Sequence, residues 1–148
     1  MICEYHCKEV FMSLDSFSIE MEVRDNELDA QGIVNNANYM IYLSHARHKH
    51  GELLNINHTE FAKRGLKLIV TSCTMKFKNS LTANDSFIVT SKITEGELPF
   101  HWAHKQDIKR VSDGKVIMKA VFNATCVNSN EDAVDKLSIP KEIEQLIS

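Results

Sequence analysis

The sequence predicts an α+β fold, in which a five-stranded antiparallel sheet wraps around one long central helix and a short helix ends the chain. Three observations predict this fold. Apolar and polar residues alternate over residues 16–23, a helical pattern follows from Ala37 to Leu54, and alternation returns in four segments from Leu68 onward. The tyrosines and leucines of the helix cover more than one stripe, so the sheet has to cover the helix.

The first strand is predicted over residues 16–23. Its apolar residues alternate with serine and glutamate, which is the pattern of a strand with one face in water. The apolar positions are Phe17, Ile19, Met21 and Val23. Residues 1–14 form a polar lead, and we expect them to be an N-terminal extension of a single domain that spans residues 1–148.

A loop and the long helix follow this strand. Residues 24–36 have the Asp, Asn and Gly content of a loop. One stripe of the helix is predicted to be apolar, with Tyr39, Leu43, Ala46, His50 and Leu53, and the opposite stripe polar, with Asn38, His45, His48, Lys49 and Glu52. A short helical turn from Thr59 is expected to stop at Gly65.

Four further strands and a terminal helix complete the chain. The strand segments are LKLIVTSCTMKFKNSL, DSFIVTSKITEGEL, PFHWAHKQDIKRV and KVIMKAVFNATCV. Asp113-Gly114 between two alternating runs is a strong signal for a tight hairpin, so the run is predicted to be antiparallel. Ser138 shortly before Pro140 is typical of a helix start, which predicts a helix from Pro140 to Leu146.

Composition limits the classes of function. A chain of 148 residues has the size of one domain, and its net charge of -3 leaves no basic excess for nucleic acid or an anionic membrane. Its apolar runs are shorter than the roughly 18 to 20 residues of a membrane span, so none is expected. Uncovered sheet edges and helix flank favour pairing between copies, which predicts a homodimer or homotetramer.

The four cysteines indicate a reducing compartment. They lack CxxC spacing, and the first residues are charged where a secretion signal is apolar, so we expect the protein in the cytoplasm. Cys3, His6 and Cys7 would begin a zinc site, but no second ligand pair is spaced to complete it, and no metal is expected. Cys73 and Cys126 lie in apolar patterns and are expected in the core.

The segment from Val23 to Arg47 carries the candidate chemistry. Asp29 lies in the loop just before the helix, Gly32 allows a tight bend, and Asn35 and Asn36 stand at the helix entrance. The unpaired N–H groups and the dipole of a helix N-terminus, equivalent to roughly half a positive charge, can hold an oxyanion. A nearby carboxylate can attack or deprotonate water, so both parts of an acyl-transfer hydrolase are present.

The strand, the LDAQGIVNNANY loop, the buried helix and the antiparallel strands resemble the hotdog-fold thioesterases of the 4-hydroxybenzoyl-CoA thioesterase type, over nearly the whole chain after about Ser16. In that family the Asp of a D-x-x-G-x-V loop is the catalytic carboxylate, which corresponds to Asp29, with Gly32 and Val34 at the following positions. The family's N–H donor to the thioester carbonyl corresponds to Asn36. VRDNELDAQGIVNNANY also resembles the branch that contains plant acyl-lipid thioesterases and their bacterial relatives.

This resemblance implies a thioesterase that hydrolyses an acyl thioester of coenzyme A or acyl-carrier protein to a free acid and a thiol. No metal or organic cofactor is required. Asp29 would act as nucleophile or general base, and the start of the central helix would form the oxyanion hole. Tyr39 could face the acyl pocket, and Lys76 and Lys78 could meet the phosphates of coenzyme A.

Two other hotdog functions are alternatives. A non-catalytic module that binds acyl-CoA would not need the carboxylate of Asp29. A hotdog dehydratase typically pairs a His with an acid, and no His occurs near the loop before His45. This chain also has Ile33 where some family members have a His, and Ser44 or His45 near the place where others have a helix Glu.

Several of these residues also have a purely structural interpretation. Asp29 could cap the helix or close an Asx turn, and Asn35 could hold Asp29 or cap the helix. Asp25 and Glu27 are expected to be surface or positioning charges of the loop.

The polar stripe of the helix contains a His/Glu pair at a spacing that can bind metal, formed by His48 and Glu52. A position at the solvent or at a subunit interface is the favoured interpretation. His45 could instead help to position water or substrate.

Overall fold

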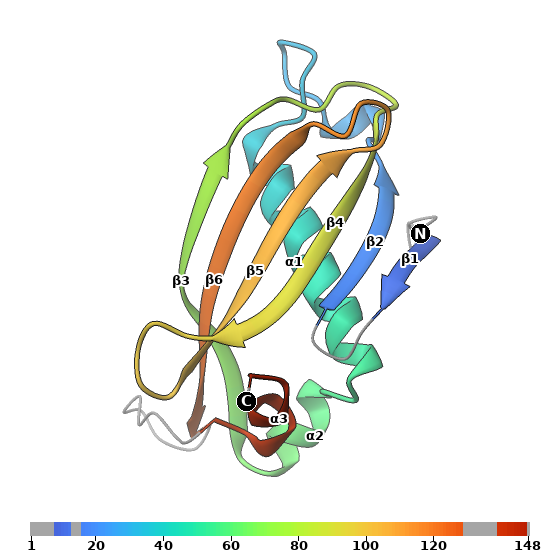
Figure 1. Cartoon of the computed structure of the whole chain (residues 1–148). Coiled ribbons are helices and arrows are strands. Elements are labelled where there is room, and N and C mark those ends of the chain that lie inside the picture. The colour runs from blue at the N-terminus through green and yellow to red at the C-terminus, as the bar shows by residue number, and fades with distance from the viewer. Residues whose placement is uncertain (1–7, 13–15, 129–138, 148) are drawn as a thin grey trace.

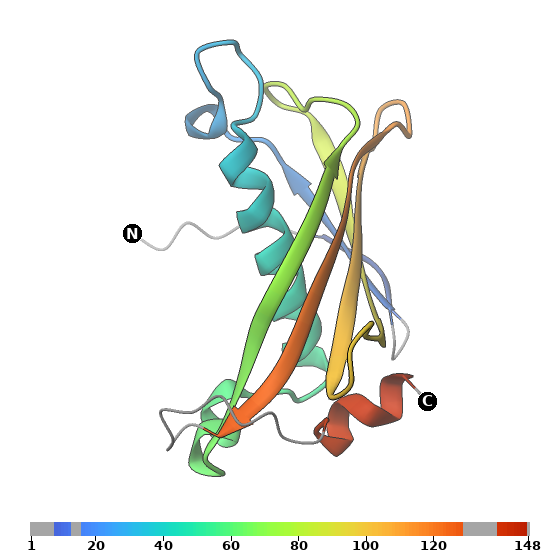
Figure 2. The same cartoon turned by 90° about the vertical axis from the view of Figure 1, so that its left-hand side faces the viewer.

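The computed structural model of the chain describes residues 8–12, 16–128 and 139–147 (Figure 1). In these residues, six strands form one sheet in the order β1-β2-β4-β5-β6-β3, and helix α1 lies along one face of it (Figures 1 and 2). The strands are β1 (Lys8–Met12), β2 (Ser16–Glu22), β3 (Leu66–Phe77), β4 (Ser86–Glu95), β5 (His101–Arg110) and β6 (Val116–Asn128). The helices are η1 (Asp25–Glu27), α1 (Asn36–Leu53), α2 (His58–Lys63) and α3 (Lys141–Ile147).

The predicted fold class is confirmed. All five predicted strands, the central helix and the short C-terminal helix are present, and every strand pair is antiparallel. The sheet also has a sixth strand, because β1, in the segment expected to be an extension, pairs with β2. β3 does not pair with β4, which follows it in the chain, but with β6, so that β3 forms one edge of the sheet. Period-two alternation specifies a strand but not its neighbours, so the sequence did not predict this crossover.

Helix α1 packs one face against the sheet. Asn35 caps the helix, since its side-chain oxygen accepts a hydrogen bond of 3.0 Å from the backbone N–H of Ala37. The buried residues of the helix recur at helical spacing and are Tyr39, Tyr42, Leu43, Ala46 and His50. The prediction that Leu53 faces the core was wrong, because its exposure is 41%. The helix ends at Leu53, and the following residue, Leu54, packs against the second hydrophobic cluster instead.

Two hydrophobic clusters form the core. The larger lies between α1 and the sheet, and the smaller contains Trp102 and Cys126 and is closed by Ile143 of α3. Cys126 is therefore buried, as predicted. Cys73 is exposed, contrary to the prediction, because β3 is an edge strand and α1 packs mainly against β2 and β4.

The predicted turns and caps are largely present. Gly114 has a φ of 67° in the hairpin between β5 and β6, and Asp113 accepts a 3.0 Å hydrogen bond from the backbone N–H of Lys115. α3 begins after Pro140, although the capping residue predicted for it, Ser138, lies outside the described residues. None of the helices in the described part of the chain is long and apolar enough to span a membrane.

Candidate active site

The loop before α1 forms a tight turn around Asp29. The Asp29 backbone N–H donates to the Ile33 carbonyl at 2.8 Å, and the Gly32 N–H donates to the Asp29 carbonyl at 3.0 Å. Gly32 has a φ of 77°, which explains why glycine suits this position. Oδ1 of Asp29 accepts a 2.8 Å hydrogen bond from the Gln31 N–H, so the side chain also closes an Asx turn. The Asp29 side chain is half-buried.

The second half of this loop is attached to the segment after β3. Val34 donates its N–H to the Leu81 carbonyl at 2.9 Å, and Ile33 forms a β-bridge with Thr82. The Tyr39 hydroxyl accepts a 3.2 Å hydrogen bond from the Leu81 N–H. Burial raises the pKa of Tyr39, which keeps the hydroxyl neutral. These bonds hold the loop, the start of α1 and the segment after β3 together.

Glu27 fixes the first half of the loop. Its exposure is 5%, its Oε2 accepts a 2.6 Å hydrogen bond from the Tyr42 hydroxyl, and its Oε1 lies 3.0 Å from Nη2 of Arg24. The Glu27 carbonyl accepts hydrogen bonds from the Asn35 N–H and from Nδ2 of Asn38, both at 2.9 Å. The carboxylate thus ties the loop to the buried face of α1, and the backbone ties it to the helix entrance.

From the sequence, Glu27 was expected to be either a surface charge or a charge that positions the loop. In the structure it positions the loop against α1. A signal for this role exists in the sequence, because Tyr42 lies between buried helix positions and its hydroxyl needs a partner. That signal could not single out Glu27 from the other acids of the loop.

We expect Glu27→Ala to lower the free energy of unfolding by about 2 to 3 kcal/mol, as measured by urea denaturation. Loss of one partner of a buried ion pair costs about 3 to 5 kcal/mol, and the partial exposure of Arg24 reduces this effect. Glu27→Gln, which retains acceptors for Tyr42, should lose less. The exposed Asp25→Ala is the control. A Glu27→Ala protein as stable as the Asp25→Ala protein would contradict the positioning role.

A pocket lies beside the Asp29 turn, at the N-terminal end of α1. Its lining residues are Asp29, Ile33, Val34, Asn36, Tyr39, Phe77, Lys78, Asn79 and Ser80. Five of the residues predicted as site residues are therefore brought together from three parts of the chain, namely Asp29, Val34, Asn36, Tyr39 and Lys78. The pocket combines a carboxylate, a helix N-terminus, aromatic rings and a cation.

The other three predicted site residues lie around this pocket without lining it. Gly32 shapes the turn, and Asn35 caps α1 through its contact with Ala37, so its side chain serves the helix. Lys76 lies between Met75, which packs on the core, and Phe77, whose ring meets that of Tyr39. Since side chains alternate along a strand, Lys76 points to the opposite face of the sheet.

The start of α1 presents a free backbone donor to the pocket. Asn36 is the first residue of the helix, so its N–H has no acceptor within the helix. Among the described residues, its N–H makes no hydrogen bond to another part of the chain either. An oxygen atom bound in the pocket is therefore a suitable acceptor for this N–H.

The aromatic wall of the pocket is partly open to solvent. Phe77 is 53% exposed, and its ring lies 5.7 Å from that of Tyr39 in an edge-to-face arrangement. Such a wall can contact an apolar substrate group. The Tyr39 hydroxyl is bound to the Leu81 N–H, so Tyr39 contributes its ring to the pocket wall.

The histidines of the polar stripe form no metal site in the described part of the chain. Nε2 of His48 lies 3.2 Å from Oε1 of Glu52, and both side chains are exposed. Among the described residues, no three His, Cys, Asp or Glu side chains are grouped to bind a metal ion. Cys3, His6 and Cys7, whose spacing would begin a zinc site, lie outside the described residues.

The chain is similar in sequence to a plant enzyme. It is 43% identical, over 76 residues, to a chloroplastic acyl-acyl carrier protein thioesterase of Arabidopsis thaliana. The matched segment covers 51% of this chain and 40% of the plant protein, so the similarity concerns less than half of that relative.

Solved structures share the fold over most of the chain. A 1,4-dihydroxy-2-naphthoyl-CoA thioesterase from Synechocystis superposes with a TM-score of 0.79 at 14% identity, covering 89% of this chain and 95% of that one. The 4-hydroxybenzoyl-CoA thioesterase from Pseudomonas sp. strain CBS-3 superposes with a TM-score of 0.77 at 16% identity, covering 89% and 99%. At these identities the likeness shows the hotdog fold alone.

The family model described as the thioesterase-like superfamily matches residues 23–147, which include the Asp29 loop, all of α1 and the four strands that follow it. The match therefore covers both the candidate site and the scaffold that carries it. The chain belongs to the thioesterase-like superfamily.

Proposed function

We propose that this protein is a thioesterase that hydrolyses an acyl thioester of coenzyme A or acyl-carrier protein at the pocket beside Asp29. One observation carries the proposal, namely that the Asp29 carboxylate and the free N–H of Asn36 line the same pocket. Membership of the superfamily supports the reaction class. The relatives are named for both kinds of carrier, the plant protein for acyl-carrier protein and the solved structures for coenzyme A.

The proposed reaction begins with the thioester carbonyl oxygen bound to the Asn36 N–H. As a general base, Asp29 accepts a proton from water while the water oxygen bonds to the carbonyl carbon. As a nucleophile, Asp29 forms an acyl anhydride that water then hydrolyses. In both routes negative charge develops on the carbonyl oxygen, the carbon–sulfur bond breaks, and the thiolate leaves and takes up a proton. The positive end of the α1 dipole stabilises the developing oxyanion.

The remaining pocket residues suit the two ends of such a substrate. The rings of Tyr39 and Phe77 provide an apolar surface for an acyl group. Lys78, after the end of β3, provides a cation for the phosphate of a pantetheine carrier. Lys76 belongs to the opposite face, so the proposal no longer includes it.

A panel of acyl thioesters tests this function. The panel should contain aromatic, short and long acyl groups on both carriers, and thiol release should be measured for each. We expect release from at least one acyl class. Tight acyl-CoA binding without hydrolysis of any member would favour the non-catalytic binding module instead.

We further propose that the protein assembles as a homodimer or homotetramer with active sites at a subunit boundary. Apolar side chains are exposed along the open flank of α1 and the edge strand β3. They include Ile41 at 52%, Val70 at 50% and Phe77 at 53% exposure. Because Phe77 also lines the Asp29 pocket, a partner on this surface would adjoin the site.

We expect multi-angle light scattering at micromolar concentration to give the mass of a dimer or tetramer. Ile41→Glu should shift the protein toward the monomer, because it places a charge in an apolar contact. Leu98→Glu is the control, since Leu98 is exposed to a comparable extent, at 59%, but lies in the turn between β4 and β5. An active monomer at this concentration would contradict the assembly.

The cytoplasm is the compartment that we propose. Cys73 and Cys126 are free thiols in the described part of the chain, which suits a reducing environment. The plant relative is named as chloroplastic, so localisation of a tagged full-length protein is the direct test.

A further inference from the structure

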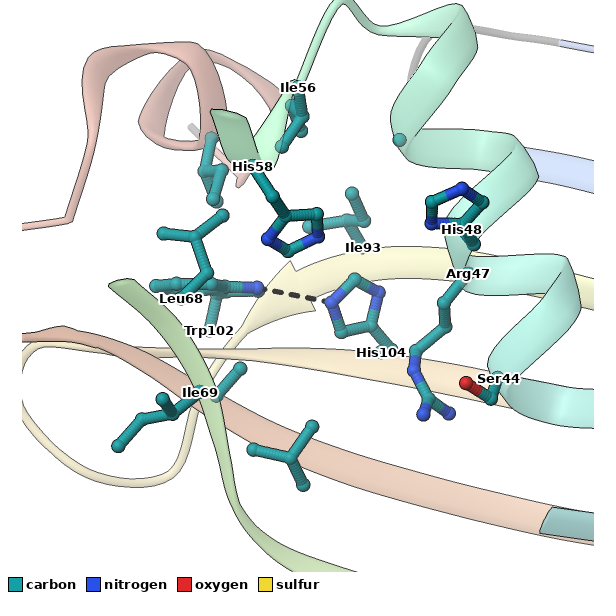
Figure 3. Close-up of a pocket in the computed structure, with 14 residues that line it drawn as sticks. Ser44, Arg47, His48, Ile56, His58, Leu68, Ile69, Ile93, Trp102 and His104 are labelled. Carbon is teal, nitrogen blue, oxygen red and sulfur yellow. Dashed lines mark hydrogen bonds between the residues drawn. The ribbon is translucent and has the colours of Figure 1, made fainter. Parts of the chain in front are cut away.

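A second cavity lies near the opposite end of α1. Its volume is about 230 Å³, and it opens between α1, β3 and β5 (Figure 3). It is lined by Ser44, Arg47, His48, Gly51, Ile56, His58, Leu68, Ile69, Val70, Ile93, Trp102, His104, Ala124 and Ile143. No lining residue is shared with the Asp29 pocket. Arg47 follows Asn36 by eleven residues, which corresponds to about 16 Å along the helix. The thioesterase proposal does not use this cavity.

The cavity contains a half-buried cation. The guanidinium of Arg47 stacks 3.9 Å above the ring of Phe122, and its Nη1 donates a 2.8 Å hydrogen bond to Oε1 of Gln106. Gln106 is held in this orientation because its Nε2 donates to the Leu43 carbonyl at 2.9 Å. These contacts fix the guanidinium in place but supply no negative charge.

Arg47 has no counter-ion within the described residues. None of their acidic side chains lies within salt-bridge distance of it, whereas other basic side chains there do form such pairs, among them Arg24, Lys49, Lys63, Arg64 and Arg110. Burial lowers the pKa of Arg47 to about 10, so the guanidinium is still charged at neutral pH. A half-buried charge without a counter-ion is costly, and an anionic ligand would relieve this cost.

A second polar group on the cavity wall also has an unused donor. Nε1 of Trp102 donates a 3.1 Å hydrogen bond to Nε2 of His104, as the dashed line in Figure 3 shows. Burial lowers the pKa of His104 to about 3, so the ring is neutral and its hydrogen is on Nδ1. Nδ1 is buried and has no hydrogen-bond partner among the described residues. An acceptor drawn to Arg47 would lie close to this donor.

The rest of the cavity wall is mainly apolar. Leu68, Ile69 and Val70 of β3 line the cavity together with the polar groups of α1 and β5, and Ile143 of α3 lines it as well. In Figure 3, Leu68 lies beside Trp102. An apolar molecule with one charged end fits a cavity whose wall is mainly apolar and carries polar groups at Arg47 and His104. The charge has to be negative, because Arg47 is a cation and both unused donors need an acceptor.

We propose that this cavity is a separate binding site for a carboxylic acid with an apolar tail, with the carboxylate held by Arg47 and His104. The tail lies against the aliphatic residues of β3 and Ile93. A guanidinium binds a carboxylate through two parallel hydrogen bonds, and Arg47 has donors left for both after its single bond to Gln106. A purely structural arginine would make the same contacts with Phe122 and Gln106 but would bind no acid.

The protein contains a reporter for this site, because Trp102 is its only tryptophan and lines the cavity. We expect sodium octanoate to change the Trp102 fluorescence in a saturable way. Titration calorimetry should give the same dissociation constant. 1-Octanol has the same tail without the charge and should bind at least roughly 10-fold more weakly, since a hydrogen bond to a charged group is the stronger one. Equal binding of the acid and the alcohol, or no saturable change with the acid, would overturn the proposal without the need for a variant.

Two variants test the arginine directly. Arg47→Gln should weaken octanoate binding roughly 10- to 100-fold, and Arg47→Lys should restore part of it. Lys49→Gln is the matched control, because it removes one positive charge from the same helix at a partly exposed position outside the cavity. If Arg47→Gln and Lys49→Gln bind octanoate equally well, Arg47 does not hold the carboxylate.

The same titration on Asp29→Asn separates this inference from the proposed hydrolysis. Unchanged octanoate binding by Asp29→Asn is the expected result, since the two pockets share no residue. Loss of octanoate binding in this variant would place the acid in the Asp29 pocket and overturn the second site. Absence of thioester hydrolysis in the wild-type protein would refute the proposed function alone and leave the binding result intact.

Discussion

Asp29→Asn is expected to lower thioester turnover at least ~100-fold, because it removes the carboxylate that attacks or deprotonates water. The fold should be unchanged. An asparagine side-chain oxygen can accept the same hydrogen bond from the Gln31 N–H that Oδ1 of Asp29 accepts at 2.8 Å. This substitution therefore separates the catalytic role of Asp29 from its role in the Asx turn. Steady-state turnover and the melting temperature should be measured on the same preparation.

The two roles of Asp29 predict different outcomes in a set of three variants. If Asp29 only shapes the turn, Asp29→Asn keeps wild-type turnover and Asp29→Ala loses stability. If Asp29 is catalytic, both variants lose turnover to a similar extent. Asp25→Asn is the control, since Asp25 is an exposed acid of the same loop and lines none of the pockets described above. A folded Asp29→Asn protein with wild-type turnover would remove Asp29 from the mechanism.

Local signals in the sequence predicted most of the fold. The alternation in β2 and the Asp113-Gly114 hairpin depend on neighbouring residues alone, and both were predicted correctly. The position of β3 beside β6 depends on the pairing of residues that lie far apart in the chain, such as Leu68 and Cys126. No short window contains this information, which is why the exposure of Cys73 on the edge strand was also missed.

The part of the candidate site that lies in one continuous segment of the chain could be predicted from the sequence. Asp29 and Asn36 lie seven positions apart, and a family resemblance is sufficient to propose them. Contacts between distant segments were not predictable in this way. The bond from Tyr42 to Glu27 and the cavity around Arg47 and His104 depend on how α1 lies on the sheet. No pattern of neighbouring residues in the sequence indicates which of these polar groups is buried or lacks a partner.

Asn36→Pro is the second substitution with a large expected effect. Proline removes the backbone N–H that we propose as the oxyanion donor, and loss of one such donor costs roughly 100- to 1000-fold in turnover. The helix should tolerate it. Asn36 is the first helical residue, where proline is favoured because the N–H has no acceptor within the helix. The preceding Asn35 has φ -59° and ψ 136°, close to the extended conformation that a residue before proline requires.

Asn36→Ala is the matched control for this donor, because it removes the side chain and keeps the N–H. Turnover should therefore fall far less in Asn36→Ala than in Asn36→Pro, while both melting temperatures stay near that of the wild type. If the side chain of Asn36 held the carbonyl instead, the alanine variant would lose as much turnover as the proline variant. A fully active proline variant would mean that the thioester carbonyl binds elsewhere. Since Asn35 rather than Asn36 caps α1, a loss of turnover without a loss of stability cannot come from a missing cap.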